Sequence, residues 1–420
     1  MRPIQPTRDI RASIRVPGSK SYTQRALIVA ALARGHSLIT GPLFSEDTEH
    51  LIKALGSLGA QVRPQGPDLT VVGTGGNVRR PSGPIYMGNN GTGLRLLTGT
   101  VTLGQGTFVL DGNDRMRQRP IQPLVDALNE LGGEVSCRKK NGCPPVEVVA
   151  KGLGGGKTTL AGGLSSQYLS SLLLAAPCAR GDVRIEVLGS LPSRPYIDMT
   201  LDVMEHFGAE VSLLDERSFL VRAPRAYRAS EYAVEGDASS ATYFMAAAAI
   251  CGGTVRIDNV SPDSVQGDLR FTHILETMGC RLGRSDKGLE ITGPLSYHGD
   301  LSFDLHDVPD MVPALAVVCA FRKGKTDLEN IGHLRIKESD RIAALTQELR
   351  KIGATVEEKE EAMVIQGLAT RGGEIDSYDD HRIAMSFAIA GLAIEGVVIK
   401  APDCVKKSFP DFWDKLESLG

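Results

Sequence analysis

The hydrophobic pattern divides the chain into six similar segments. One run in each segment is rich in Ala and apolar on nearly every side, which predicts a buried helix. A second run is apolar on one side only, which predicts an outer helix that covers the core. Each outer run ends in an apolar residue followed by Gly, as expected where a helix closes in the left-handed conformation. These glycines recur roughly every 70 residues, which indicates an internal repeat, and they are Gly59, Gly132, Gly208, Gly279, Gly353 and Gly420.

Strand-like segments separate the two kinds of helix. Short β-type segments follow the first five outer helices, and a segment such as HSLIT or TVRI follows each buried helix. We therefore expect an α/β fold made of strand-helix-strand-helix-strand-strand repeats. Six repeats divide most simply into two domains of three, with the segment 222–234 as the best boundary. The buried helices end near Gly35, Gly106, Gly181, Gly253, Gly324 and Gly396.

The unusual polar residues fall at one equivalent place, the N-terminal ends of the buried helices. Ser, Asp and Asn there are explained as N-caps, and for any single helix that explanation suffices. It does not explain the cations at the same ends, because a buried cation needs a partner. Helix N-termini attract anions, so an anionic ligand is the simplest partner. The cations concerned are Lys20, Arg25, Arg95, His381 and Arg382.

A second cationic set lies in the loops before the outer helices. The stretch from His333 to Arg341 holds two carboxylates and three permanent cations. Taken alone, it is better explained as the charged cap of a surface helix, but the cations elsewhere favour an anion site with Glu338 as a proton donor or acceptor. Arg forks suit phosphate or carboxylate. The other cations of these loops are Arg115, Arg117, Arg119, Arg194, Lys406 and Lys407, of which Arg117, Arg194 and Lys406 are expected to be solvated. Ser193 and Tyr196 are polar residues of the same loops.

Composition limits the function classes. The net charge of -3 argues against a general binder of nucleic acid or membrane surfaces. Seven scattered cysteines without a CxxC pair argue against a zinc site and predict reduced thiols in the cytoplasm. The longest apolar runs are about half a membrane span, and the N-terminus has no apolar core like that of a signal peptide. Gly152 to Thr159 looks like a phosphate-binding loop, but Lys151 stands where that pattern needs Gly, so we expect a flexible turn.

Nine motifs in order resemble the 3-phosphoshikimate 1-carboxyvinyltransferase (EPSP synthase) family over essentially the whole chain. The family fold has two similar domains, each of three βαβαββ repeats around parallel buried helices, an inverse α/β barrel. The resemblance implies that 1–18 joins 235–420 in one domain, that 19–234 forms the other, and that the active site lies in the cleft between them. The motifs are PGSKSYTQRAL, GNNGTGLRLLTG, DGNDRMRQRPI, SSQYLSSLL, SRPYIDMTL, GDASSATYF, HLRIKESDR, DDHRIAM and KKSFPDF.

The resemblance also implies the reaction. In the family, the enolpyruvyl group of phosphoenolpyruvate moves to the 5-hydroxyl of shikimate 3-phosphate through a tetrahedral intermediate, and phosphate leaves. This step belongs to the shikimate pathway of aromatic amino acid biosynthesis, and it needs neither a metal nor an organic cofactor. We expect a monomeric, cytoplasmic enzyme whose partners are these two small molecules, not nucleic acid or membrane. Because Gly91 is retained, we also expect inhibition by glyphosate at the phosphoenolpyruvate site.

By motif match, the expected site residues fall into three groups. Asp310 is the expected proton acceptor and Glu338 the proton donor, and Lys20 is also expected to act in catalysis. The residues expected to bind shikimate 3-phosphate are Lys20, Ser21, Arg25, Ser165, Ser166, Gln167, Ser193, Tyr196, Asp310, His333 and Lys337. The residues expected to bind phosphoenolpyruvate are Lys20, Gly91, Arg119, Gln167, Arg341, His381, Arg382 and Lys407.

Two departures and two alternatives accompany this interpretation. Leu96 stands where many members have Pro, and His333 stands where many have Asn. The nearest alternative is the related enolpyruvyl transferase that acts on UDP-N-acetylglucosamine, which usually carries a reactive Cys where this chain has 114–119 without one. The other is a catalytically silent anion-binding protein on the same scaffold. Asp310 and Glu338 argue against it, since carboxylates in an anion site are costly unless they are used.

Overall fold

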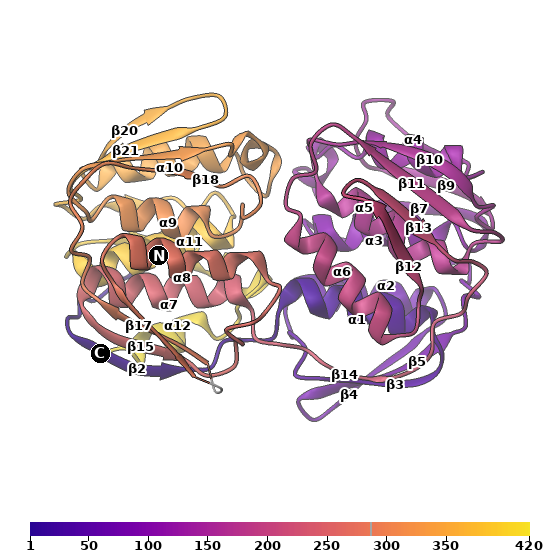
Figure 1. Ribbon diagram of the computed structural model, residues 1–420, viewed down its shortest axis with the longest axis horizontal. Helices are drawn as coiled ribbons and strands as arrows, with labels where there is room; N and C mark the ends of the chain where they lie inside the picture. Colours follow the sequence, from indigo (N-terminus) through magenta and orange to yellow (C-terminus); the bar gives the residue numbers. More distant parts are fainter. Residues whose placement is uncertain (286–287) are drawn as a thin grey trace. The chain divides into compact units, whose positions relative to one another are not determined.

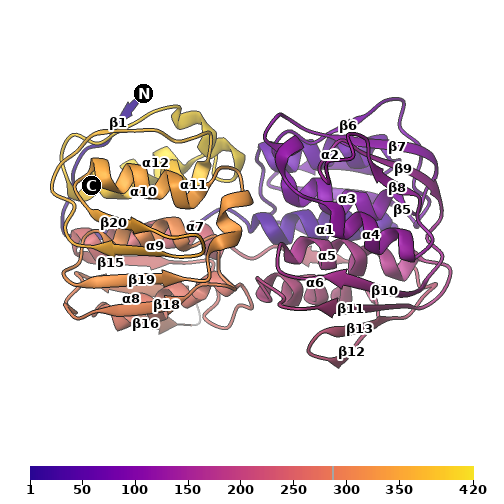
Figure 2. The same cartoon turned by 90° about the horizontal axis from the view of Figure 1, so that it is seen from above.

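A computed structural model covers the chain and describes residues 1–285 and 288–420 (Figures 1 and 2). The chain divides into two compact units. Unit 1 consists of Met1–Pro17 and Glu235–Gly420, and unit 2 consists of Gly18–Val234. Each unit contains inner helices that are buried nearly all round, outer helices that are buried on one side, and sheets of short strands.

In unit 2 the inner helices pack against one another. Every residue of the first of them is buried from Tyr22 to Leu32, which confirms the predicted buried helix. Leu96 lies fully buried within the second, whose helical bonding runs through that residue. Leu96, in place of the Pro found in many family members, therefore leaves this helix intact. The inner helices are α1 (Lys20–Leu32), α3 (Gly91–Val101) and α5 (Ser166–Ala175), and the outer helices are α2 (Glu46–Ser57), α4 (Gln122–Glu130) and α6 (Pro195–His206).

The sheets of unit 2 share one pairing pattern. The first two strands in each order are parallel, and the remaining pairs are antiparallel. A parallel pair needs a long connection between its strands, and here each such connection contains at least one helix. One order is β14 (Glu231–Ala233), β3 (Arg34–Thr40), β5 (Asp68–Thr74) and β4 (Gln61–Gln65). The next is β6 (Ile85–Tyr86), β7 (Gln105–Asp111), β9 (Val146–Lys151) and β8 (Val135–Cys137). The third is β10 (Gly156–Ala161), β11 (Val183–Leu188), β13 (Ser218–Val221) and β12 (Val211–Asp215).

Unit 1 repeats the arrangement. Its inner helices α7 (Ala238–Cys251), α9 (Val312–Cys319) and α11 (His381–Ala393) contact one another. Its outer helices are α8 (Arg270–Thr277), α10 (Arg341–Lys351) and α12 (Phe412–Glu417). One sheet contains β16 (Arg281–Ser285), β17 (Gly288–Gly293), β15 (Gly253–Ile257) and β2 (Ile10–Ile14). The others contain β18 (Leu301–Asp304), β19 (Lys325–Glu329), β21 (Met363–Gln366) and β20 (Thr355–Glu358), and β1 (Arg2–Pro3), β23 (Val398–Ile399) and β22 (Glu374–Ile375).

Two strands complete sheets that are distant from them in the sequence. Strand β2 pairs in parallel with β15, so that Ala12 lies opposite Val255. Strand β14 pairs in parallel with β3, so that Tyr232 lies opposite Ile39 (Figure 1). In both sheets the distant strand takes the place that the first strand of a repeat takes elsewhere. The segment 222–234 therefore contains part of unit 2's sheet as well as its end.

The glycine pattern is confirmed at the outer helices. Gly59, Gly132, Gly208, Gly279 and Gly353 have φ values of 107°, 84°, 82°, 95° and 102°, the region that favours Gly. The predicted turn at 152–159 is right only for its first half, because β10 begins at Gly156 and no helix follows the glycines directly. A strand there excludes the helix N-terminus that a phosphate-binding loop requires.

Residues 1–285 and 288–420 contain no helix long and apolar enough to cross a membrane. Over the same described ranges, no group of His, Cys, Asp and Glu side chains is placed to hold a metal ion. Each cysteine of the sequence lies within them and is a free thiol.

Candidate functional site

In unit 2, the starts of the inner helices meet. Asn90 caps α3 by accepting a bond from the backbone N–H of Gly93 at 2.8 Å. The amide nitrogen of Asn90 donates to the backbone oxygen of Asp47 at 2.8 Å, and the carboxylate of Asp47 lies 3.5 Å from Nζ of Lys20. Asp47, near the start of α2, thus links the first turns of α1 and α3. This places Lys20 where both helix N-termini favour negative charge.

Arg25, one turn into α1, is a buried cation with neutral neighbours. Its side chain is 1 % exposed, and it donates to Thr200 Oγ1 at 2.8 Å and to Ser170 Oγ at 3.3 Å. It also donates to the backbone oxygens of Ser21 at 3.0 Å and Tyr196 at 3.1 Å. Burial lowers the pKa of Arg25 to about 10. Within the described part of the chain none of these acceptors is a carboxylate, so the charge is left for an anion to neutralise.

Gln167 in the first turn of α5 is held in a fixed orientation. Its Oε1 accepts from Arg95 Nη1 at 2.6 Å, and its Nε2 donates to Thr92 Oγ1 at 2.9 Å. Arg95 also donates to the backbone oxygen of Pro120 at 2.9 Å and lies over the ring of Tyr168. Arg95 was expected to contact an anion, and in the structure its guanidinium binds the side chain of Gln167. These contacts also bring the starts of α3 and α5 together.

Arg119 lies against the start of α3. Its Nη1 donates to both the backbone and side-chain oxygens of Asn89 at 3.1 Å. A Cβ at Gly91 would lie 2.6 Å from Cζ of Arg119, which is closer than real contacts allow. The guanidinium therefore occupies the space that the missing side chain leaves. Both residues belong to the predicted phosphoenolpyruvate set.

The predicted serines of unit 2 lie near the same helix starts. Ser165 caps α5 by accepting from the N–H of Gln167 at 3.3 Å, and Ser166 is buried in the first turn. Ser193 is 4 % exposed and has a left-handed φ of 60°. Its backbone oxygen accepts from the N–H of Tyr196 at 3.1 Å, and the Tyr196 ring faces Arg25. The loop before α6 thus lies beside Arg25.

In unit 1, two guanidiniums hold one carboxylate. Asp310, just before α9, accepts from Arg382 Nη2 at 2.8 Å and from Arg341 Nη1 at 3.2 Å. Arg341 also donates to Glu338 at 2.9 Å. Asp310 and Glu338, the predicted proton acceptor and donor, therefore contact the same guanidinium.

Arg341 is 1 % exposed and is fixed from behind by Asp380. Its Nε donates to Asp380 Oδ2 at 2.8 Å, while Asp380 also caps α11 by accepting from the N–H of Arg382 at 3.0 Å. Burial alone would lower the pKa of Arg341, but the carboxylates of Asp380, Glu338 and Asp310 outweigh burial and raise it. Arg341 is therefore permanently charged, and Asp380 sets its position.

The remaining predicted residues of unit 1 lie in adjoining turns. His333 belongs to the 3-10 helix η4 (Gly332–Ile336), and Lys337 follows it. Burial first, and then the charges of Lys337 and His306, lower the pKa of His333 to about 3, so its imidazole is neutral near pH 7. His381 begins α11 and is fully buried, and Lys407 is 7 % exposed at the end of η5 (Pro402–Lys407), which packs against α11.

Sequence reasoning missed several residues that shape these clusters. Asp47 and Asp380 bind the cations from behind, and Tyr243 and Asp268 lie near Arg382 and Asp310. The sequence allows Asp380 to be predicted as an N-cap. Its bond to Arg341 could not be predicted, because the two residues are 39 positions apart. The three expected surface cations have protein partners, namely Asp111 and Asp114 for Arg117, Asp198 for Arg194, and Asp403 for Lys406.

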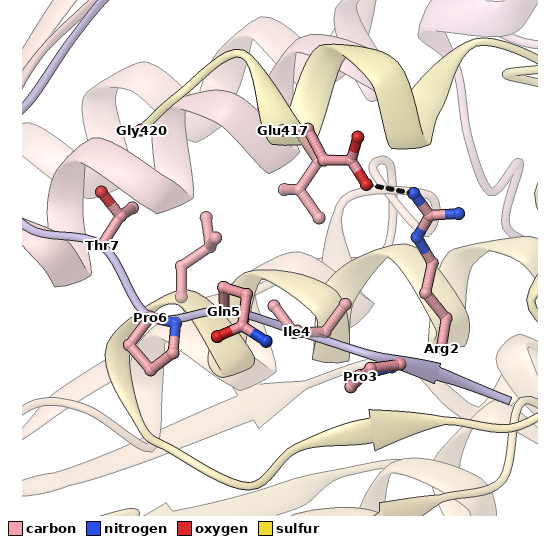
Figure 3. A pocket seen from close by; sticks show the side chains of 10 residues that line it. Arg2, Pro3, Ile4, Gln5, Pro6, Thr7, Glu417 and Gly420 are labelled. Carbon is pink, nitrogen blue, oxygen red and sulfur yellow. Dashed lines mark hydrogen bonds and ion pairs between the residues drawn. The ribbon is translucent and has the colours of Figure 1, made fainter.

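A separate cavity of about 290 Å³ lies in unit 1 (Figure 3). Its lining includes Ile4, Thr7 and Leu416, with Arg2 bonded to Glu417 across one side. Its lining on α11 is Leu392, near the C-terminal end of that helix, whereas His381 and Arg382 begin the helix. The cavity is therefore not part of the clusters described above.

Comparison with known proteins identifies the family. The family model described as EPSP synthase (3-phosphoshikimate 1-carboxyvinyltransferase) matches residues 4–416. A Sulfurovum protein named 3-phosphoshikimate 1-carboxyvinyltransferase is 43% identical over 99% of this chain and 98% of its own, and a chloroplastic one from Brassica napus is 42% identical over 99% and 84%. The EPSP synthase structure from Acinetobacter baumannii is 28% identical, with a TM-score of 0.83 over 100% of this chain and 98% of its own. The chain belongs to the EPSP synthase family.

Proposed function

We propose that this protein transfers the enolpyruvyl (1-carboxyvinyl) group of phosphoenolpyruvate to the 5-hydroxyl of shikimate 3-phosphate and releases phosphate, a step of aromatic amino acid biosynthesis. One structural observation carries the proposal beyond family membership. Asp310 lies between the guanidiniums of Arg341 and Arg382, and Glu338 binds the first of these. A base and an acid thus share one cationic cluster, as addition of an alcohol to an anionic enol phosphate requires.

The proposed proton transfers use the two carboxylates. Asp310 takes the proton of the 5-hydroxyl as its oxygen attacks C2 of phosphoenolpyruvate, and Glu338 gives a proton to the methylene carbon. The C–O bond to phosphate then breaks as Glu338 takes a proton back from the new methyl group. Arg341 and Arg382 offset the negative charge of the phosphoenolpyruvate groups, and Lys20 acts on the bridging oxygen of the departing phosphate.

The proposed shikimate 3-phosphate set centres on Arg25. Its buried charge meets only neutral acceptors in the described part of the chain, and this supports phosphate as its partner. In unit 1, Asp310 would bind the reacting hydroxyl. The neutral imidazole of His333 suits a ring hydroxyl. The rest of the set is Lys20, Ser21, Ser165, Ser166, Gln167, Ser193, Tyr196 and Lys337.

The proposed phosphoenolpyruvate set centres on Arg119 and Arg341. Arg119 fills the space beside Gly91, and Arg341 is held in place by Asp380. Fixed guanidiniums bind carboxylate and phosphate bidentately at low entropic cost. The rest of the set is Lys20, Gln167, His381, Arg382 and Lys407. Glyphosate, as an anion that would compete for these groups, is the proposed inhibitor.

We also propose that the enzyme acts as a monomer in the cytoplasm, with these small molecules as its partners. Free thiols at each cysteine fit a reducing compartment. Light scattering during size exclusion should give a single mass near 44.9 kDa. A dimer mass that persists on dilution would contradict the proposed monomer.

The test of the activity is a coupled phosphate-release assay with purified protein. We expect phosphate only when shikimate 3-phosphate and phosphoenolpyruvate are both present. Release with UDP-N-acetylglucosamine in place of shikimate 3-phosphate would support the related transferase instead. Absence of release with either acceptor would support a silent anion-binding protein and overturn the proposal.

A further inference from the structure

Glu348 is a buried carboxylate that the proposed mechanism leaves unused. It lies in α10 and is fully buried. Nζ of Lys351 donates to its two oxygens at 2.8 Å and 2.7 Å, and the side chain of Lys351 is 43 % exposed. An ion pair between neighbours on one helix contributes little to stability. This pair therefore does not account for a carboxylate that has lost all contact with water, which is costly.

Glu348 also binds the turn 376–380, which joins β22 to α11. Tyr378 OH donates to its Oε1 at 2.6 Å, and the backbone N–H of Asp376 donates to its Oε2 at 3.2 Å. Oε1 of Gln347 also lies 2.9 Å from Tyr378 OH, but the carboxylate, at the shorter distance, is the stronger acceptor. Within the turn, the N–H of Tyr378 donates to Asp376 Oδ1 at 2.9 Å.

The backbone of this turn has a conformation that needs support. Tyr378 and Asp379 have φ values of 54° and 53°, in the left-handed region that residues with a side chain rarely adopt. Two such residues in succession persist only where the surrounding contacts determine their conformation. Glu348 supplies contacts of this kind at Asp376 and Tyr378. Without them, the turn is expected to relax toward a more ordinary conformation.

The last residue of the turn is Asp380, which orients two guanidinium side chains. It accepts from Nε of Arg341 at 2.8 Å and from the backbone N–H of Arg382 at 3.0 Å. Arg341 and Glu348 are seven residues apart on α10, so they lie on the same face of that helix. One face of α10 therefore holds the turn near its start, through Glu348, and at its end, through Arg341.

We propose that Glu348 is a positioning residue for phosphoenolpyruvate, because it holds the strained turn that ends in Asp380. The inference rests on the proposed function, in which Arg341 and Arg382 bind phosphoenolpyruvate and Asp380 orients them. Glu348 is assigned no contact with substrate and no proton transfer. When its contacts are lost, the turn relaxes, and the guanidiniums lose the fixed orientation that bidentate binding of a carboxylate or phosphate needs.

The test is Tyr378→Phe, which removes the hydroxyl that Glu348 holds and keeps the ring. With shikimate 3-phosphate saturating, we expect the KM for phosphoenolpyruvate to rise about tenfold, because a hydrogen bond to a charged acceptor is lost. We expect kcat to fall less than about threefold and the KM for shikimate 3-phosphate to change less than about twofold. Reduced stability alone would lower the active fraction, and hence kcat, without moving either KM. A native KM for phosphoenolpyruvate in the folded variant would overturn the inference.

Glu348→Gln tests the other side of the same contact. The amide keeps an oxygen for Tyr378, but its NH2 group cannot accept the N–H of Asp376. We expect the KM for phosphoenolpyruvate to rise again, and the double variant to raise it by less than the product of the two single effects, since both act on one turn. A double effect equal to that product would show independent actions and overturn the inference. If Glu348→Gln does not fold, Tyr378→Phe decides alone.

Tyr227→Phe is the matched control. Tyr227 is buried in unit 2, where its OH donates to the backbone oxygen of Leu174 at 3.1 Å. We expect this variant to melt at a lower temperature with both KM values native. A rise in the KM for phosphoenolpyruvate as large as that of Tyr378→Phe would mean that any lost tyrosine hydroxyl has this effect, and it would overturn the inference.

The native protein separates the inference from the function on which it rests. If it releases no phosphate, the proposed function and the inference fail together. If it releases phosphate and Tyr378→Phe keeps its KM for phosphoenolpyruvate, only the inference fails.

Discussion

The guanidinium of Arg119 lies where the side chain of residue 91 would be, because a Cβ at Gly91 would come within 2.6 Å of Cζ and Nη2 of Arg119. Most of α3 and the whole of β7 lie between the two residues in the sequence. Even so, the absence of a side chain at position 91 makes room for the guanidinium of Arg119. Any side chain at position 91 must displace the cation that the proposed phosphoenolpyruvate site uses.

Gly91→Ala should therefore weaken phosphoenolpyruvate binding. A displaced Arg119 loses its bidentate geometry, and a loss of about 1.4 kcal/mol would raise the KM for phosphoenolpyruvate about tenfold. Glyphosate inhibition should weaken as well, because the inhibitor is proposed to use the same groups. Steady-state kinetics and inhibition curves measure both effects. An inhibition curve that matches the native one would refute the shared site.

The control for this substitution is Gly56→Ala in α2. A Cβ there has nothing within 4 Å. Ala in place of a helical Gly reduces the entropy of the unfolded chain, so the free energy of unfolding should rise by about 0.4–1 kcal/mol. Kinetic constants should stay native. Denaturant titration of both variants would separate the steric effect at position 91 from the general effect of Ala.

Asp310→Asn and Glu338→Gln should each lower kcat by about 10²–10⁴-fold, because each removes a proton-transfer group. Arg341 keeps its bonds to Asp380 in both variants, so folding should be preserved. Glu374→Gln, which breaks an exposed pair with Lys400, is the control and should keep native turnover. Phosphate release under saturating substrates measures all three. Native turnover in either of the first two variants would remove that residue from the mechanism.

Arg25→Lys should weaken shikimate 3-phosphate binding while leaving the KM for phosphoenolpyruvate nearly unchanged. Lysine keeps the charge, but it cannot reach Thr200, Ser170 and Tyr196 with one fork. We expect the dissociation constant for shikimate 3-phosphate, measured by calorimetry, to rise at least about tenfold. The change Arg63→Lys, at an exposed residue whose guanidinium donates to Gln61, should have no effect. Equal losses in both variants would contradict a specific role for Arg25.

His333 should contribute to acid unfolding. Its pKa is lowered from 6.5 to about 3 in the folded protein, whereas the unfolded chain takes up its proton near pH 6.5. Below pH 6.5 the unfolded state therefore binds more protons, and stability falls as pH decreases toward 3. His333→Asn should lose less stability than the native protein between pH 6.5 and 4. Chemical denaturation at a series of pH values measures this, and parallel curves would show that His333 does not contribute.

The helices could be predicted because the burial of a helix determines which of its positions are apolar. Every residue from Ala26 to Leu32 is apolar and buried, and this run indicates an inner helix without any knowledge of its neighbours. The glycines that close the outer helices are similarly local, because a left-handed φ is a property of one residue.

The cation partners could not be predicted in the same way. Arg95 and Arg25 are both Arg residues near the start of an inner helix, yet Arg95 binds the Gln167 amide, whereas Arg25 binds two hydroxyls and two backbone oxygens. The difference depends on contacts across 72 or more positions of the sequence, which no local pattern records. Asp268 was missed for the same reason, since its bond from Ser239 arises only from packing against α7. Likewise, β14 is three residues long and gives no periodic signal.

The pairing of β2 with β15 also constrains the order of folding during synthesis. Unit 2 is one continuous stretch of chain and can fold as soon as it leaves the ribosome. Strand β2 cannot, because Ala12 must pair with Val255, which is 243 residues later (255 − 12). At about 5–20 residues per second the ribosome needs roughly 10–50 s to supply that partner. Strand β2 is thus made before unit 2 but completes its sheet only after unit 2 has been made, and this long-range pairing predicts that unit 1 folds after unit 2.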